Sequence, residues 1–206
     1  SGFLDPSAGK VRIGGQDMGG IGPNKRPTAL IFQNLALFPL MTVADNITYG
    51  LTSPAISATE AYRRRDEASR IAQLHDTIAA LPDGFETKLG ERGINLSGGQ
   101  KKLLELGRTM MVDAKIVFLD EVGAGVNRTL LNTIGDAIIR LNKERGYTFV
   151  VIEHDMDFIG RLCDPVICMA EGKVLAQGTL AEIKANEQVI EAYLGTGLKN
   201  KDKVGA

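Results

Sequence analysis

Two acidic side chains directly follow an apolar run near the middle of the chain. Residues 116–119 read Ile-Val-Phe-Leu, and Asp120 and Glu121 come next. A short apolar run rich in β-branched residues is typical of a strand buried in a parallel sheet. Open α/β sheets bind their ligands at the carboxyl ends of such strands. This position predicts that Asp120 holds a metal ion and that Glu121 orients or deprotonates a water molecule.

A helix with glycines in its first turn is predicted upstream of these carboxylates. Ser97 and Gln100 form a capping-box pattern, and apolar residues continue at helical spacing to Met111. Gly98 and Gly99 in the first turn cost helix stability. Glycines in a first turn are expected where a ligand approaches the backbone closely, because they carry no side chain that would block it. At a helix N-terminus the N–H groups and the helix dipole bind anions. We therefore expect this turn to face an anion.

The two segments resemble motifs of ATP-binding-cassette (ABC) ATPases. Leu96–Gln100 is similar to their signature motif, and residues 118–121 are similar to their Walker B strand with its catalytic glutamate. The resemblance implies an α/β fold: a P-loop NTPase-like core with a mostly parallel sheet, plus a helical subdomain that carries the signature motif. It also implies that ATP is bound, that Asp120 helps to hold Mg²⁺ and that Glu121 is the general base.

Two further segments extend the resemblance to residues that would position water and phosphate. Residues 32–47 resemble the Q-loop region of ABC importers, which implies that Gln33 touches the metal ion and the attacking water. Residues 151–156 resemble the H-loop, which implies that His154 contacts the γ-phosphate. Taken alone, a glutamine at a strand end can serve local backbone bonds, and a lone histidine is more often part of a core.

The resemblance also implies a dimer. In this family Ser97, Gly98, Gly99 and Gln100 would bind the ATP held by a second ABC subunit in a head-to-tail homo- or heterodimer. Asn127 occupies the D-loop position, which crosses to that subunit and adds to the nucleotide site. The further partners implied are transmembrane permease subunits, and nucleic acid is not among them.

One expected motif does not occur in the sequence. A phosphate-binding loop of the form G-x-x-x-x-G-K-[ST] is absent, since Gly9-Lys10 and Gly172-Lys173 are each followed by valine. The chain begins Ser1-Gly2-Phe3 and reads as a fragment. We expect the phosphate-binding loop and the N-terminal β-subdomain to lie upstream, so that these 206 residues alone bind ATP poorly and hydrolyse it negligibly.

Composition narrows the class of protein. The chain is 44% hydrophobic and 24% charged with a net charge of −1, which is typical of a globular domain and argues against a nucleic-acid surface. It contains no run of about 18 apolar residues that could span a membrane. Cys163 and Cys168 fit neither a redox pair nor a zinc site, so reduced thiols are expected. With the family resemblance, these features predict a peripheral protein on the cytoplasmic face of the cell membrane.

Periodicity predicts the organisation of the partial ABC domain 1–206. We expect a helical subdomain over 52–111, the Walker B, D-loop and H-loop half over 112–197, and a polar tail over 198–206. The helical part begins at a cap at Ser57 and carries Arg63–Arg65, expected to be a solvated face or, alternatively, a phosphate contact. Strands are expected at 10–13, 28–32, 116–119, 148–152, 165–169 and 173–177, and one final helix after Thr179.

The subfamily is less clearly indicated. The C-terminal half resembles the ATPase subunits of branched-chain amino-acid importers, residues 20–51 resemble sugar or polyamine importers, and the middle resembles exporters. We favour the branched-chain amino-acid importer because it is the longest coherent match. The alternatives are an ABC exporter and, for these residues alone, a catalytically inactive interaction module; a soluble ABC ATPase of DNA repair or translation is less favoured.

Overall fold

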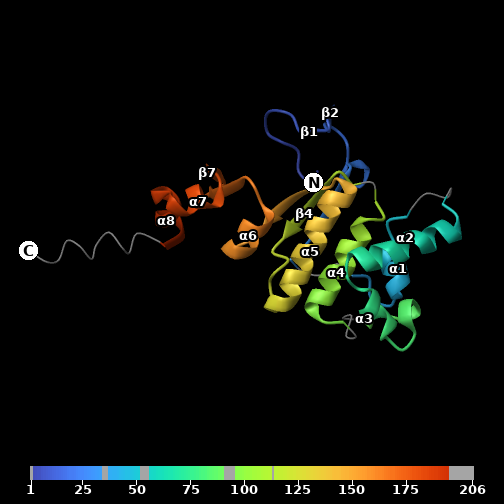
Figure 1. Cartoon of the computed structure of the whole chain (residues 1–206). Coiled ribbons are helices and arrows are strands. Elements are labelled where there is room, and N and C mark those ends of the chain that lie inside the picture. Colours follow the sequence, from blue (N-terminus) through green and yellow to red (C-terminus); the bar gives the residue numbers. More distant parts are fainter. Residues whose placement is uncertain (1, 34–36, 52–55, 91–95, 113, 195–206) are drawn as a thin grey trace, which may run out of the picture. The chain divides into compact units, whose positions relative to one another are not determined.

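The computed structural model describes residues 2–33, 37–51, 56–90, 96–112 and 114–194 (Figure 1). It divides into two compact units, Ser1–Glu153 and His154–Ala206. In the first unit the elements are β1 (Arg12–Ile13), β2 (Gln16–Asp17), η1 (Pro23–Lys25), β3 (Thr28–Ile31), α1 (Val43–Thr48), α2 (Ala58–Ile71), α3 (His75–Ala79), η2 (Gly84–Glu86), α4 (Gly98–Thr109), β4 (Ile116–Asp120), α5 (Arg128–Arg145) and β5 (Thr148–Ile152). The strand predicted at 10–13 is shorter than expected: only β1 forms, and it pairs with β2, which was not predicted, in an antiparallel hairpin.

A parallel three-stranded sheet lies at the centre of the first unit. Its order is β3–β4–β5, and Val117 of β4 is in register with Ala29 of β3 and Phe149 of β5. Val117 and Leu119 are buried, as the apolar run at 116–119 predicted. Because the strands are parallel, all three end at one edge of the sheet. The residues that follow Ile31, Asp120 and Ile152 therefore share that edge.

Helix α4 connects the sheet to the other helices. It contacts α1, α2, α5 and β3, and Figure 1 shows α1, α2 and α3 gathered beside it. Its leucines at 103, 104 and 106 are buried, and α5 buries Leu131, Ile134, Ile138 and Leu141 at helical spacing. This shared core fixes the N-terminus of α4 relative to the strand ends.

Helix α2 begins at the cap predicted at Ser57, and of its three arginines only Arg65 departs from the expected solvated face. Ser57 caps α2, with Oγ accepting the Glu60 N–H at 3.2 Å. Arg65 was expected on a solvated face, and this is wrong: its side chain is only 14% exposed. Its guanidinium carbon lies 3.9 Å from the Phe85 ring centroid and 4.9 Å from that of Tyr62. Stacking on two rings buries the planar cation between α2 and η2.

The second unit holds α6 (Met156–Leu162), β6 (Val166–Ala170), β7 (Lys173–Gly178), α7 (Leu180–Ala185) and α8 (Glu187–Leu194). Strands β6 and β7 form an antiparallel hairpin, and a small core contains Ile159, Val166, Ile183 and Val189. The expected final helix is in fact two helices, because Asn186 is extended and its side chain caps α8.

Three other predictions concern this unit or the whole chain. Cys163 and Cys168 are free thiols, and burial raises the pKa of Cys163. Among the residues that the structure describes, we find no helix with the length and apolarity needed to cross a bilayer. The tail predicted at 198–206 lies outside the described residues.

Candidate functional site

The two carboxylates end β4 in a tight turn. Both Asp120 and Glu121 are half-buried, and the Glu121 N–H continues the ladder by donating to the Ile152 carbonyl at 2.9 Å. Glu121 has φ 45°, in the left-handed region that non-glycine residues rarely adopt. Such backbone costs of order 1–3 kcal/mol and persists only where neighbours enforce it. Here the Ala124 N–H donates to the Glu121 carbonyl at 3.1 Å, which closes the turn.

A third carboxylate stabilises this turn from the next strand. Glu153 follows β5, and its Oε1 accepts the N–H of Gly123 at 2.7 Å. A Cβ at Gly123 would lie 3.3 Å from the same oxygen, so a side chain there would crowd the bond. Val122, the residue after Glu121, is buried. The turn is thus held by strand pairing, by Glu153 and by packing.

Gln33 reaches the catalytic carboxylate predicted from sequence. It follows β3 by two residues, and its Nε2 donates to Glu121 Oε2 at 2.5 Å. The two residues are 88 positions apart in the sequence. Their contact follows from the register, in which Ile31 pairs with Leu119 and the chains leave the sheet side by side. Gln33 and Glu121 are therefore parts of one site.

Lys102 also belongs to this site, and sequence reasoning missed it. The residue is 4% exposed on α4, and its Nζ donates to the carbonyl oxygens of Gln33, at 2.7 Å, and of Phe32. Burial lowers the pKa of Lys102, and the negative charges of Glu105, Asp120 and Glu153 oppose that shift. A signal was available, because helical spacing places residues 99, 102, 103 and 106 on one buried face.

The signature turn forms as predicted, but its two glycines serve different purposes. Ser97 N–H donates to Gln100 Oε1 at 2.8 Å, and Gln100 N–H donates to Ser97 Oγ at 3.3 Å, completing the capping box. A Cβ at Gly99 would lie 2.1 Å from Leu130 Cδ2, so a side chain of the same chain requires that glycine. At Gly98 the nearest atom would be 4.0 Å away, and Ser97 and Gly98 are exposed. The backbone that faces solvent is thus that of Ser97 and Gly98.

The two remaining candidates lie at helix starts. Asn127 caps α5, with Oδ1 accepting the Leu130 N–H at 2.9 Å, and its loop approaches α4 through Val126, next to Gly99. His154 is exposed and precedes Asp155, the cap of α6. His154 belongs to the second unit, so its role toward phosphate stays a prediction.

The donors at the edge suit Mg²⁺, which prefers oxygen ligands. Asp120 offers a carboxylate, and Gln33 offers its amide oxygen while its nitrogen binds Glu121. Within the described ranges, we find no cluster of three or more acidic, histidine or cysteine side chains arranged for a metal ion. A Mg²⁺ ion at Asp120 would therefore need oxygens from nucleotide phosphates and water, which is how proteins commonly bind it.

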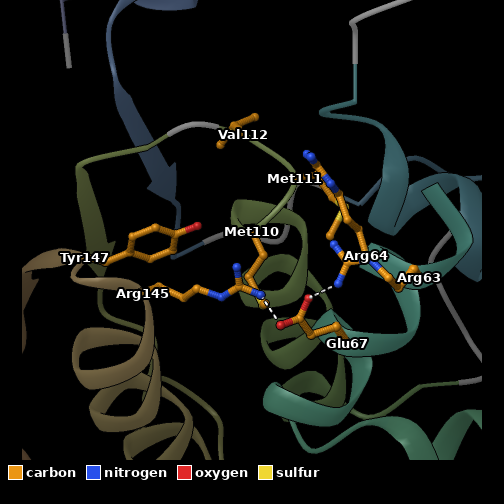
Figure 2. Close-up of a pocket in the computed structure, with 8 residues that line it drawn as sticks. All are labelled: Arg63, Arg64, Glu67, Met110, Met111, Val112, Arg145 and Tyr147. Carbon is orange, nitrogen blue, oxygen red and sulfur yellow. Dashed lines mark hydrogen bonds and ion pairs between the residues drawn. The ribbon is translucent and has the colours of Figure 1, made fainter. Parts of the chain in front are cut away.

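A cavity of about 460 Å³ lies elsewhere in the first unit (Figure 2). It is lined by residues of α2, of the segment between α4 and β4, of the end of α5 and of the segment between α5 and β5: Arg63, Arg64, Glu67, Met110, Met111, Val112, Arg145 and Tyr147. These segments precede β4 and β5, so the cavity lies at the amino ends of those strands, opposite Asp120.

The charges of this cavity are paired within the chain. Glu67 bridges Arg145 of α5 and Arg63 of α2, the latter at 3.4 Å. Glu60 accepts bonds from Arg63 and Arg64 at 2.7–2.8 Å, and these guanidinium groups lower the pKa of Glu60 to about 2. The network joins α2 to α5 and is best explained as structural.

Comparison with known sequences identifies the family. A sequence model described as ABC transporter matches residues 1–124. The chain belongs to the ABC transporter family. A second model, described as Branched-chain amino acid ATP-binding cassette transporter, matches residues 173–199 of this ABC domain.

Individual relatives include importers and exporters. The Spermidine/putrescine import ATP-binding protein PotA of Thermobifida fusca is 30% identical over 198 residues, which are 95% of this chain and 49% of the relative. ABC transporter B family member 28 of Arabidopsis thaliana is 31% identical over 94% of this chain and 26% of its own. The chain thus spans at most about half the length of these relatives.

A solved structure confirms the predicted fold class. The structure of a bacterial Atm1-family ABC exporter with ATP bound matches with a TM-score of 0.76 and 26% identity, covering 93% of this chain and 32% of that one. The predicted α/β ABC ATPase core is therefore confirmed. Because the similar proteins include both directions of transport, the importer subfamily stays a prediction.

Proposed function

We propose that this ABC domain is the ATP-binding and ATP-hydrolysing part of an ABC transporter, of the branched-chain amino-acid importer type. The observation that carries the proposal is the contact between Gln33 and Glu121 at the end of β4, next to Asp120. Phosphoryl transfer to water needs a positioned base and charge stabilisation more than covalent chemistry. A half-buried carboxylate oriented by a neutral amide at a strand end meets the first requirement.

Each residue of the site has an assigned role. Glu121 accepts the proton of the attacking water, and Gln33 orients that carboxylate and the water. Asp120 and the amide oxygen of Gln33 hold Mg²⁺, which neutralises phosphate charge when it is bound. His154 positions the γ-phosphate. These roles require ATP at the edge of the sheet, with its γ-phosphate in front of Glu121.

A second ABC subunit completes the arrangement. Ser97, Gly98, Gly99, Gln100 and Asn127 are assigned to the ATP of a head-to-tail partner. Support comes from the exposed N-terminus of α4, a helix long enough to present N–H groups to an anion. Gly99 contributes through its backbone, since Leu130 occupies its side-chain space. Permease subunits at the cytoplasmic membrane face would receive the resulting movement.

The phosphate-binding loop is assigned to a segment outside these 206 residues. The sequence holds no such loop, and in the described sheet β5 pairs with β4 alone. Val150 and Ile152 of β5 are 41% and 52% exposed although their types are typical of buried parallel strands. A further strand and its connections would bury them. Without that segment we expect ATP turnover by this chain to be negligible.

The test is ATP turnover by two proteins, this chain and a version extended upstream along its own gene through the phosphate-binding loop. We expect turnover by the extended protein alone and its loss in extended Glu121→Gln. An inert extended protein would overturn the proposal in favour of an interaction module. Turnover that survives Glu121→Gln would overturn the role of Glu121.

The direction of transport needs a separate observation. The match at residues 173–199 supports the amino-acid importer, whereas the solved exporter structure favours the alternative. The same upstream gene sequence separates them. A transmembrane region fused ahead of this domain would contradict the importer, and a short soluble N-terminus would agree with it.

A further inference from the structure

A buried lysine of the signature helix holds the strand end from which Gln33 extends. Lys102 Nζ donates to the carbonyl oxygens of both Phe32 and Gln33, across about 70 positions of sequence. Those two carbonyls stand just past the end of β3, where the ladder with β4 no longer fixes the backbone. The lysine thus replaces the missing sheet bonds with two charge-assisted hydrogen bonds, which are roughly twice as strong as neutral ones.

The cost of burial argues that the ammonium group has a specific task. Lys102 is 4% exposed, and charged lysines are almost never buried unless they are paired. Three acidic residues around it, Glu105, Asp120 and Glu153, favour its charged form. Asp120 directly precedes Glu121, and Glu153 accepts the N–H of Gly123 in the turn after Glu121. The buried cation therefore interacts with these carboxylates and holds the backbone of Phe32 and Gln33 through two hydrogen bonds.

We propose that Lys102 is a positioning residue that sets the Gln33 amide against Glu121 and so orients the general base. The proposal rests on the proposed ATPase function. It adds to that function a residue of α4, whose N-terminus is the signature turn. Lys102 lies five positions after Ser97, about 7–8 Å along the same helix, so one rigid element carries both.

The first test uses this 206-residue chain and does not depend on turnover. The side-chain amide of Gln33 is followed by NMR with ¹⁵N-labelled glutamine, and the Phe32 carbonyl by ¹³C-labelled phenylalanine. Lys102→Met keeps the aliphatic stem and removes the donors, and Lys101→Met on the same helix is the control. We expect Lys102→Met to shift both signals and to speed exchange of the Gln33 amide with solvent. Lys101→Met should shift neither.

The second test uses the extended protein. Lys102→Met should lower kcat by about 10-fold to 100-fold, the range seen when a supporting residue misplaces a catalytic group, and leave the KM for ATP within about twofold. Lys102→Arg, which retains cation and donors, should recover part of the loss. In a double-mutant cycle Gln33→Ala should make Lys102→Met nearly silent, because Lys102 acts on Glu121 only through the position of the Gln33 side chain, which Gln33→Ala removes.

The outcomes separate the two proposals. The role of Lys102 would be overturned if Lys102→Met left the NMR signal of the Gln33 amide unchanged. It would also be overturned if the fold-losses in kcat of Lys102→Met and Gln33→Ala multiplied in the double variant, because the two residues would then act independently. If the extended wild-type protein is inert, the proposed function fails, and the NMR arm alone still decides whether Lys102 positions Gln33. Should Lys102→Met fail to fold, Lys102→Gln keeps a neutral donor on a shorter stem and takes its place in both arms.

Discussion

The two ends of helix α4 lie near two charged regions that differ in how their carboxylates are bound. Near its N-terminus, the carboxylate of Glu121 is bound by a neutral amide, that of Gln33, on strained backbone. Near its C-terminus, the cavity region holds Glu60 and Glu67, each bound by two guanidinium groups. A guanidinium neighbour makes a carboxylate a weaker base, as the pKa of about 2 at Glu60 shows. Gln33 orients the Glu121 carboxylate without adding a positive charge, so of these two regions the Gln33–Glu121 contact is the one that fits the proposed proton transfer.

The largest expected effect is a loss of ATP turnover on substitution of Glu121 that substitution of Glu67 does not cause. In the extended protein, Glu121→Gln removes the base and should lower kcat by about 10²-fold to 10⁴-fold. Glu67→Gln, the matched change in the cavity, should leave kcat within about twofold because its partners serve structure. Steady-state ATP turnover with both purified variants is the measurement. Equal losses from the two substitutions would remove the distinction between the regions.

The next largest effect is a loss of stability on substitution of Gly99, one of the two glycines in the first turn of α4. Gly99→Ala should lower the free energy of unfolding by about 1–3 kcal/mol, since its Cβ would overlap Leu130 and force repacking. Adding Leu130→Ala should restore part of the loss as a favourable coupling. Gly98→Ala has space and should change stability by no more than about 0.5 kcal/mol. Urea unfolding of the 206-residue chain measures these variants and Leu130→Ala alone, which the coupling requires. Equal effects at the two glycines would contradict the packing explanation.

Much of this architecture was predictable because its signals are local. The apolar run before Asp120 fixed β4 as a buried parallel strand, and the Ser97–Gln100 pattern fixed the start of α4 with both capping bonds. The apolar strand at 148–152 has the bounds expected. Each of these depends on residues within one element, where periodicity and capping chemistry act directly.

The features that were missed depend on contacts between distant segments. Nothing in the sequence distinguishes Lys102 from the other lysines, but in the fold it bonds the Phe32 carbonyl. The sequence around Arg65 is typical of a solvated helix face, but in the fold the Phe85 ring of η2 lies over its guanidinium group. At Gly99 the sequence indicated a ligand near the backbone and gave no sign that Leu130 occupies the space of a side chain there. In each case the contacting residue that explains the observed role lies 20 or more positions away in the sequence.

A smaller effect is expected from the bridge that joins α2 to α5. Glu67→Ala removes the contacts with Arg63 and Arg145, but its side chain is 37% exposed and water screens the pair. The free energy of unfolding should fall by no more than about 1 kcal/mol, and the difference should shrink in 1 M salt, where the screening length is about 3 Å. Arg140→Ala, whose partner Glu144 lies on the same helix, is the control. A loss several times larger would show that the cavity region is dry and tightly coupled.

The smallest expected effect is a pH dependence at Glu60. Its pKa in the folded chain is about 2 against an ordinary value of 4.5, because Arg63 and Arg64 bind the ionised form. The folded state therefore holds fewer protons than the unfolded state between these values, and the stabilisation present above pH 4.5 is lost as pH falls toward 2. Urea unfolding at neutral pH and at about pH 3 should show a smaller acid-induced loss in Glu60→Gln than in the native chain.

Glu187→Gln, at an exposed glutamate of α8, is the control for this pH experiment. It should leave the acid-induced loss as it is in the native chain. If Glu60→Gln behaves in the same way, the two guanidinium groups do not hold protons off Glu60. Glu60 would then no longer show what neighbouring cations do to a carboxylate in this fold, and its contrast with the Gln33–Glu121 contact would lose its support.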